Sequence, residues 1–114
     1  MKLHEYTLRP EPFSLIKSHK KVIEMRLYDE KRQLIKTRDI LSFENTETHE
    51  IIKCEVVGLK RFPSFKEMYE YYSPEEIGYE KGSHPDYHDM AQYYSEEKIA
   101  KYGTLAIRIK LIEN

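Results

Sequence analysis

Lys21, Glu24 and Arg26 are the residues of this chain whose types and spacing could support chemistry. From residue 20 to residue 27, apolar and charged side chains alternate, which is typical of a β-strand with one buried face and one charged face. Since residues two apart on a strand share a face, Glu24 and Arg26 project together. A carboxylate beside a guanidinium, with lysines just before them, forms either a salt-bridged sheet surface or the floor of a polar site. The sequence allows both interpretations.

The three side chains differ in what they can do chemically. The Lys21 ammonium suits a phosphate or another oxyanion, and the Arg26 guanidinium can grip a phosphate or a base edge with two hydrogen bonds. Glu24 can hold Arg26 in place, accept a hydrogen bond from an exocyclic amine, or act as a general base. A general base needs a raised pKa, whereas two adjacent cations lower the pKa of a carboxyl group. We therefore expect recognition rather than catalysis.

The charged residues are unevenly distributed along the chain, although the formal net charge is only −1. Residues 17–38 contain eight Lys or Arg and three acidic residues, whereas residues 64–97 contain nine acidic residues and two lysines. A basic face on a nearly neutral protein can receive phosphate groups. The alternatives are a solvated surface, pairing between the two halves, or an acidic half that contacts another protein.

Length and composition indicate one small folded domain that spans residues 1–114. Hydrophobic residues make up 39% of the chain, which is enough for one modest core and argues against disorder. No apolar run approaches the ~20 residues of a membrane span, and the first residues lack the apolar stretch of a signal peptide. The single cysteine, Cys54, fits a reducing compartment, and its apolar neighbours predict a buried side chain rather than a catalytic thiol. We therefore expect a cytoplasmic protein without a membrane partner.

The elements that must position the candidate residues are predicted to form a small α+β fold. Strands are expected at residues 3–8, 20–27, 39–43, 51–59 and 104–112, and helices at residues 12–18, 65–72, 86–94 and 95–102. Leu34 and Ile35 are the expected inward residues of the polar connection at residues 28–38, and Gly58 is a candidate β-bulge. Since strands and helices do not alternate regularly, we expect a mostly antiparallel β-barrel of about five or six strands, with short helices packed at its openings.

Tyrosine supplies most of the large aromatic surface, because the chain contains ten tyrosines and no tryptophan. Tyr6, Tyr28 and the Tyr93–Tyr94 pair could stack on nucleic-acid bases. Tyrosines in a small domain more often pack in the core, with the hydroxyl near the surface. We expect this packing role for three residues of the predicted helix at residues 65–72: Tyr69, Tyr71 and Tyr72.

His84 and His88 have the spacing of a metal-binding pair, but two features argue against a metal site. Pro85 interrupts the helix that would align the two imidazoles, and no third ligand is fixed by spacing. The sequence also shows no phosphate-binding glycine loop, serine nucleophile motif or paired cysteines. We therefore expect no metal and no other cofactor.

The segment from Pro12 to Phe43 resembles the ASCH domain, a branch of the PUA-like β-barrel superfamily. The family motif Gly-x-Lys-x-x-Glu-x-Arg corresponds to His19, Lys21, Glu24 and Arg26. The resemblance extends over essentially the whole chain. Its supporting residues are His4, Pro12–Phe13, Asp29, Lys31, Arg32, Asp39–Phe43 and Tyr102–Gly103.

The resemblance implies a PUA-like barrel that binds RNA, or a nucleoside or nucleotide, in a cleft beside the barrel. The floor of that cleft would be Lys21, Glu24 and Arg26, which match the family motif. Further ligand contacts are expected from three other residues: Lys20, Arg32 and Asn45.

The alternative function that the resemblance suggests is hydrolysis of a modified nucleoside or of RNA. Some small bacterial ASCH-like proteins are acetylcytidine amidohydrolases, which use a Lys, a Thr and a Glu. Lys21 matches the Lys, but Glu24 occupies the Thr position, so the hydroxyl of that mechanism is absent. If the chain is an enzyme, Lys21 and Glu24 are the expected catalytic acid–base pair.

The sequence departs from the family at two positions where glycine is usual, His19 and Arg38. Glycine at such positions supplies a positive φ in a tight turn. Histidine tolerates this conformation somewhat better than most residues, whereas arginine is not particularly suited to it. A different type of turn at these positions is therefore one interpretation of the departure.

Overall fold

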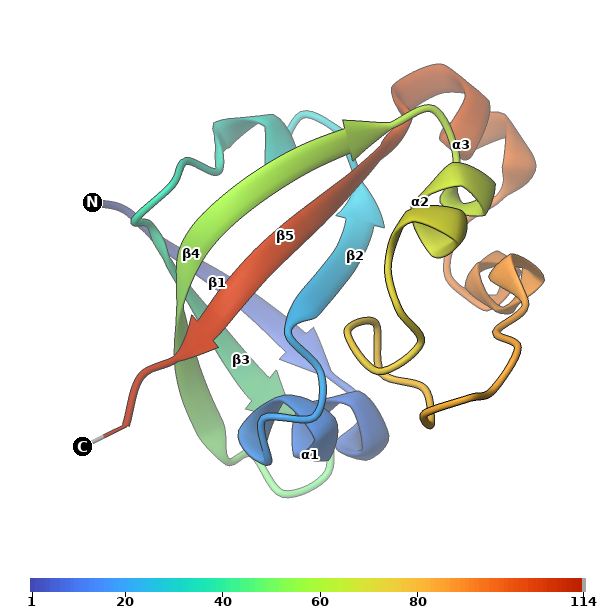
Figure 1. Ribbon diagram of the computed structural model, residues 1–114. Coiled ribbons are helices and arrows are strands. Elements are labelled where there is room, and N and C mark those ends of the chain that lie inside the picture. The colour runs from blue at the N-terminus through green and yellow to red at the C-terminus, as the bar shows by residue number, and fades with distance from the viewer. Residues whose placement is uncertain (114) are drawn as a thin grey trace.

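The computed structural model describes residues 1–113, which form a curled five-stranded sheet with short helical segments around it (Figure 1). The strands are β1 (Leu3–Leu8), β2 (Ile23–Leu27), β3 (Ile40–Asn45), β4 (Ile51–Phe62) and β5 (Thr104–Leu111). The helices are α1 (Pro10–Lys17), α2 (Phe65–Tyr71) and α3 (Glu96–Tyr102), and two 3₁₀ helices are η1 (Arg32–Leu34) and η2 (Tyr87–Gln92). The predicted α+β class is confirmed. None of the described helices is both long and apolar enough to cross a bilayer.

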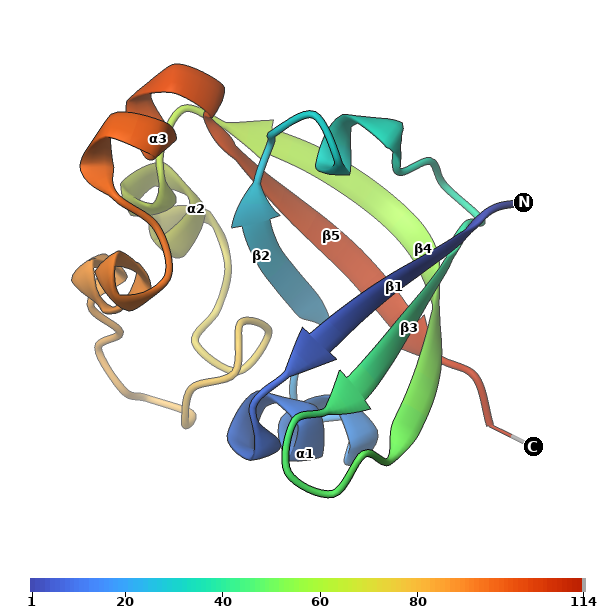
Figure 2. The same ribbon diagram turned by 180° about the vertical axis from the view of Figure 1, so that it is seen from behind.

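The strand order in the sheet is β1-β3-β4-β5-β2. The β1–β3 pair is parallel, and the other three pairs are antiparallel, as expected for a mostly antiparallel sheet. The register of β4 on β5 shifts between Val56 and Gly58, which confirms the predicted bulge. The bulge lies in the longest strand, where the sheet bends most visibly (Figures 1 and 2).

The predicted barrel is not closed, because β1 and β2 are the two edges of the sheet and do not pair. Other groups occupy their free backbone positions. The Ile23 N–H on β2 donates to the Glu76 carbonyl at 2.9 Å, and Lys31 Nζ donates to the Glu5 carbonyl on β1 at 3.3 Å. Because β1 and β2 are not paired, the curled sheet stays open between them. The sheet is therefore a five-stranded half-barrel.

Side chains of β1 and β2 contact each other, although the backbones of these two strands are not paired. The Arg26 guanidinium carbon on β2 lies 4.9 Å from the centre of the Tyr6 ring on β1. We call this line of contact between the two edge strands the seam. Although β1 and β2 are the most distant strands in sheet order, the curl of the sheet brings their side chains together.

Both faces of β2 are buried, against two different apolar clusters. Ile23, Met25 and Leu27 face α2 and η2, where they pack with residues such as Met68 and Met90. The opposite face, which carries Glu24, turns toward the interior of the half-barrel. A second cluster fills that interior and includes residues from β1, α1, β3, β4 and β5. The predicted alternation in β2 is confirmed, but its charged face does not lie in solvent.

Two connecting regions differ in part from expectation. Ile35 is buried as predicted, whereas Leu34 is 55% exposed, so the prediction for Leu34 is wrong. Leu34 is the last residue of η1, and the tight turn carries its side chain away from the core. His19 and Arg38 have φ values of 64° and 80°, so both retain the left-handed conformation that glycine adopts most easily. Both positions therefore have the positive φ that glycine would supply, although neither residue is glycine.

Candidate functional site

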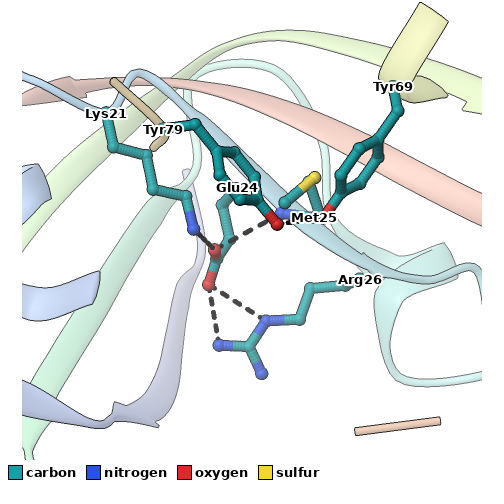
Figure 3. A network of polar contacts seen from close by, with 6 residues as sticks. All are labelled: Lys21, Glu24, Met25, Arg26, Tyr69 and Tyr79. Atoms are coloured by element: carbon teal, nitrogen blue, oxygen red, sulfur yellow. Dashed lines mark hydrogen bonds and ion pairs between the residues drawn. The ribbon is translucent and has the colours of Figure 1, made fainter. Parts of the chain in front are cut away.

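The candidate site is built around the buried Glu24 carboxylate, which accepts hydrogen bonds on both oxygens (Figure 3). Lys21 Nζ donates to Oε1 at 3.0 Å, and the Met25 N–H donates to the same oxygen at 3.3 Å. Arg26 Nε and Nη2 donate to Oε2 at 3.1 and 2.8 Å. Glu24 and Arg26 meet because they are two apart on one strand, and Lys21 reaches them from the segment just before β2. We call Lys21, Glu24 and Arg26 the charged triad.

Glu24 and Arg26 stay charged because their opposite charges stabilise each other. Burial alone would raise the pKa of Glu24, but the charges and hydrogen bonds of Lys21 and Arg26 outweigh it and bring this pKa down to about 2. Burial would lower the pKa of Arg26, but the Glu24 carboxylate raises it overall. Glu24 is therefore an anion at neutral pH and poorly suited to accept a proton in catalysis.

A cavity of about 570 Å³ opens beside the charged triad. Its volume lies in the range of sites for small organic ligands. The walls come from β2, from the start of α1, from α2 and from the segment at residues 77–94. The aromatic residues in the wall are Tyr69, Tyr79, Tyr93 and Tyr94. We call this space the tyrosine cavity.

The wall of the tyrosine cavity carries a chain of hydroxyl groups in addition to the charged triad. Tyr79 Oη donates to Asp89 Oδ2 at 2.8 Å, and the Tyr69 and Tyr79 hydroxyl oxygens lie 2.9 Å apart. Because Tyr79 gives its proton to Asp89, Tyr69 is the donor in the second bond. Burial and the hydrogen bond donated to the Asp89 carboxylate raise the pKa of Tyr79, so this hydroxyl remains protonated. Figure 3 shows these two tyrosines beside the charged triad.

Arg9 connects the two sides of the tyrosine cavity. Its Nη1 donates to Gln92 Oε1 at 3.1 Å, and its guanidinium carbon lies 5.1 Å from the centre of the Tyr93 ring. Arg9 directly precedes α1, whereas Gln92 and Tyr93 lie at the end of η2. This contact joins segments that are more than eighty residues apart in the chain.

A second cavity, of about 460 Å³, lies along β1 on the other side of the seam. Thr7 and Arg26 line both cavities, so these two residues form part of the wall of each. The second cavity is also lined by Lys31 and Arg32. We call it the basic cavity.

The family model of the ASCH domain matches residues 7–113, which is nearly the whole chain. This chain belongs to the ASCH domain family. A search among functionally curated proteins gives no match. Domains of this family are in general RNA-binding.

Solved structures agree with this assignment. The crystal structure of the hypothetical protein PH0355 is 40% identical, has a TM-score of 0.81, and the match covers 98% of this chain and 100% of that one. The solution structure of PF0455 from Pyrococcus furiosus is 36% identical, with a TM-score of 0.74 and coverage of 98% and 99%. The S128A mutant of ZmASCH from Zymomonas mobilis shares the fold at 17% identity and a TM-score of 0.67, with coverage of 96% of this chain and 68% of that one.

The structure of this ASCH domain brings together four of the six predicted ligand contacts. The charged triad lines the tyrosine cavity, and Arg32 lines the basic cavity, where Asp29 Oδ2 holds its guanidinium at 2.9 Å. Two predicted contacts lie elsewhere. Lys20 is exposed and lines neither cavity. Asn45 is the buried last residue of β3, and its side-chain oxygen accepts two backbone hydrogen bonds from the turn that follows.

The tyrosines that were expected to stack on bases have different environments. Tyr6 is 7% exposed and surrounded by cations, so its ring is not available for stacking. Tyr28 lies 4.1 Å from the Arg61 guanidinium carbon and lines neither cavity. Tyr93 is 47% exposed and Tyr94 stacks on Phe65, and both line the tyrosine cavity.

Sequence reasoning missed several residues of the tyrosine cavity. Tyr69 packs as expected but also presents its hydroxyl to the cavity, and Tyr79 and Asp89 had not been considered. Tyr71 was expected to pack, yet it is 62% exposed. The segment at residues 77–94 has little regular structure, so no periodic signal in the sequence could have placed these side chains.

The remaining candidate groups lie away from the cavities. Cys54 is fully buried as predicted, and burial raises the pKa of its thiol to about 12, which makes it unreactive at neutral pH. His88 Nδ1 lies 2.6 Å from Asp86 Oδ1. Within residues 1–113, no three His, Cys, Asp or Glu side chains are grouped so that they could hold a metal ion.

Proposed function

We propose that this ASCH domain binds RNA or a nucleotide by holding one base in the tyrosine cavity. The observation that carries the proposal is the position of the charged triad, with Lys21 and Glu24 buried, in a cavity whose wall contains four tyrosines. Proteins that recognise bases of single-stranded RNA combine hydrogen bonds to the base edge with aromatic stacking, and this cavity offers both. Its volume suits one base or nucleoside better than a longer segment.

The polar groups of the tyrosine cavity could read the edge of a base. Lys21 and the Arg26 Nη1 group can donate hydrogen bonds, since Glu24 engages only Nε and Nη2 of Arg26. Asp89 can accept a hydrogen bond from an exocyclic amine with its second oxygen. Because these groups are partly withdrawn from water, a base that fails to match them would leave buried polar groups unpaired.

The charges around the tyrosine cavity favour a neutral base over a chain of phosphates. Its lining contains three cations and three carboxylates, so these formal charges cancel. The cations are Arg9, Lys21 and Arg26, and the carboxylates are Glu11, Glu24 and Asp89. A cavity of balanced charge gives little general attraction for a polyanion.

Binding is a better proposal than hydrolysis for this arrangement. Both oxygens of Glu24 already accept hydrogen bonds, and its pKa of about 2 makes it a weak base. Lys21 Nζ donates a hydrogen bond to the same carboxylate, so it is not free to act as a nucleophile.

Paired tyrosine substitutions would test the proposal. Tyr93→Ala removes an exposed ring from the cavity wall, whereas Tyr71→Ala removes an exposed ring outside it. The two sites are well matched, because a cation lies 5.1 Å from the Tyr93 ring centre and 5.0 Å from the Tyr71 ring centre. Stacking on one base contributes ~1–3 kcal/mol, so we expect Tyr93→Ala to weaken binding about tenfold and Tyr71→Ala to leave it unchanged.

The assay is a titration of each protein with the common ribonucleosides, acetylated cytidine and short single-stranded RNAs, followed by the rise in melting temperature. Melting of the unliganded variants controls for loss of fold. Equal binding by Tyr93→Ala, Tyr71→Ala and the wild type would contradict the placement of a base in the tyrosine cavity.

A further inference from the structure

Three cations converge on one buried ring at the seam. The charged atoms of Arg26, Lys31 and Arg32 lie 4.9, 4.4 and 5.3 Å from the centre of the Tyr6 ring. Attraction to the ring holds these cations close together despite their mutual repulsion. All four residues line the basic cavity.

The positive charge of this group is only partly neutralised by direct contacts. Glu24 binds Arg26 and Asp29 binds Arg32, but Lys31 Nζ donates to the backbone carbonyl of Glu5 and contacts no carboxylate among the described residues. One cation of the three therefore lacks an anionic partner in residues 1–113.

Two buried polar atoms at the same place lack hydrogen bonds. Tyr6 Oη and Arg32 Nε are the buried side-chain polar atoms without a partner in the described part of the chain. Arg32 Nε can only donate a hydrogen bond, and the Tyr6 hydroxyl can also donate one. Buried donors without acceptors are rare in folded proteins, and both would be satisfied by the oxygens of an anion.

The outer end of the basic cavity limits the size of such an anion. Glu5 and Glu44 also line the cavity, and Glu44 is held by His49 at 2.7 Å. These carboxylates would repel the additional negative charges of a diphosphate or triphosphate. The charge distribution therefore suits a single phosphate group that lies close to Tyr6.

We propose that Arg26, Lys31 and Arg32 form the binding site for one phosphate group of the nucleotide whose base lies in the tyrosine cavity. The two cavities share Arg26 and Thr7, so base and phosphate would occupy adjoining spaces on either side of the seam. This inference rests on the proposed function for the position of the base. It assigns the anionic part of the ligand to Arg26 together with Lys31 and Arg32. The last two residues do not line the tyrosine cavity and can therefore be tested separately.

The test compares each common ribonucleoside with its 3′- and 5′-monophosphates and with 3′,5′-linked dinucleotides, by calorimetric titration. We expect a phosphate to strengthen binding about tenfold in the wild type, since charge-assisted hydrogen bonds are the strong ones. Lys31→Gln and Arg32→Gln should each reduce this enhancement to less than about threefold, while the affinity for the nucleoside stays the same. Lys66→Gln, an exposed lysine on α2 outside both cavities, should retain the full enhancement.

The outcomes separate this inference from the proposed function. An enhancement with dinucleotides indicates an RNA backbone as the source of the phosphate, and one with monophosphates alone indicates a free nucleotide; both support the site. No enhancement in the wild type, or full enhancement in both Lys31→Gln and Arg32→Gln, would overturn it. Lys31→Gln keeps the comparison valid if Arg32→Gln fails to fold, because Lys31 is exposed.

If no nucleoside or nucleotide binds, the proposed function fails. A titration with inorganic phosphate then tests the phosphate site separately. The readout is the NMR signal of the Arg32 Nε–Hε group, which lacks a hydrogen-bond partner in the described residues. A saturable shift of this signal, weakened in Lys31→Gln, would uphold the phosphate site. An unchanged signal would refute it.

Discussion

Glu24→Gln removes the negative charge that separates two buried cations, and its effect on stability can be worked out from the structure. Glu24 is 3% exposed and Lys21 is 8% exposed, so water cannot readily replace the lost carboxylate. Glutamine has the same shape, and its side-chain oxygen can accept a hydrogen bond from one of the two cations. Its amide nitrogen is a hydrogen-bond donor, however, and would face the other cation, which is also a donor. Breaking a buried ion pair by removing one partner typically costs about 3–5 kcal/mol.

The pKa of Glu24 gives a second route to this magnitude. Its fall from the ordinary 4.5 to about 2 corresponds to about 3 kcal/mol, at 1.36 kcal/mol per pKa unit. Because the pKa is lowered in the folded state, this stabilisation is fully present above pH 4.5 and is lost as the pH falls toward 2. The Glu24→Gln variant has no titrating group at this position. The difference in unfolding free energy between the wild type and the variant should therefore narrow by about 2 kcal/mol between pH 7 and pH 3.

Urea denaturation of both proteins at several pH values between 7 and 3 measures this difference. Asp39 also has a pKa lowered to about 2, but it titrates in both proteins and cancels in the comparison. Glu70→Gln, at an exposed position of α2, is the matched control and should change stability by less than ~0.5 kcal/mol. If Glu24→Gln lowers the unfolding free energy by less than ~1 kcal/mol at pH 7, the account of the charged triad is refuted. It is also refuted if the decrease at pH 3 is as large as the decrease at pH 7.

Two further predictions concern backbone positions with positive φ, and urea denaturation at pH 7 checks both. Gly78 has a φ of 98°, and a Cβ added there would lie 3.1 Å from Lys21 Cδ. Gly78→Ala should therefore cost about 1–2 kcal/mol and weaken ligand binding by displacing Lys21; unchanged stability would contradict the strain at this position. Arg38→Gly should raise the unfolding free energy by up to ~1 kcal/mol, because glycine adopts the left-handed conformation at φ 80° without strain. The greater conformational freedom of glycine in the unfolded chain offsets part of this gain. A loss of stability would show instead that the Arg38 side chain contributes more than its backbone costs.

The charged triad could be predicted from sequence because its contacts are local. Lys21, Glu24 and Arg26 lie within six positions, and the two-residue period of a strand places the last two on one face. The same period gave the five strands, since alternation of apolar residues depends only on neighbours along the chain. Whether the charged face of β2 points to solvent or to the interior is not encoded in that period.

The surroundings of the charged triad depended on contacts between distant segments. Tyr6 and Arg26 lie on opposite edges of the sheet, and only the curl of the whole sheet brings them to 4.9 Å. Part of the wall of the tyrosine cavity comes from the segment at residues 77–94, whose path depends on side-chain contacts rather than on a repeating pattern. The sequence also could not show whether the two edge strands pair, because backbone groups are alike in every residue.

By itself, the sequence determined the strands, the charged triad and membership of a family with a recognisable motif. The tertiary structure decided that Lys21 and Glu24 are buried and that Arg26 lines two cavities. It also decided that Lys31 and Arg32 meet Arg26 around the Tyr6 ring. The physical reason is the range of the interactions. Periodicity records which side chains share a face within a few residues, whereas burial and charge clustering depend on how the whole sheet curls and which segments cover it.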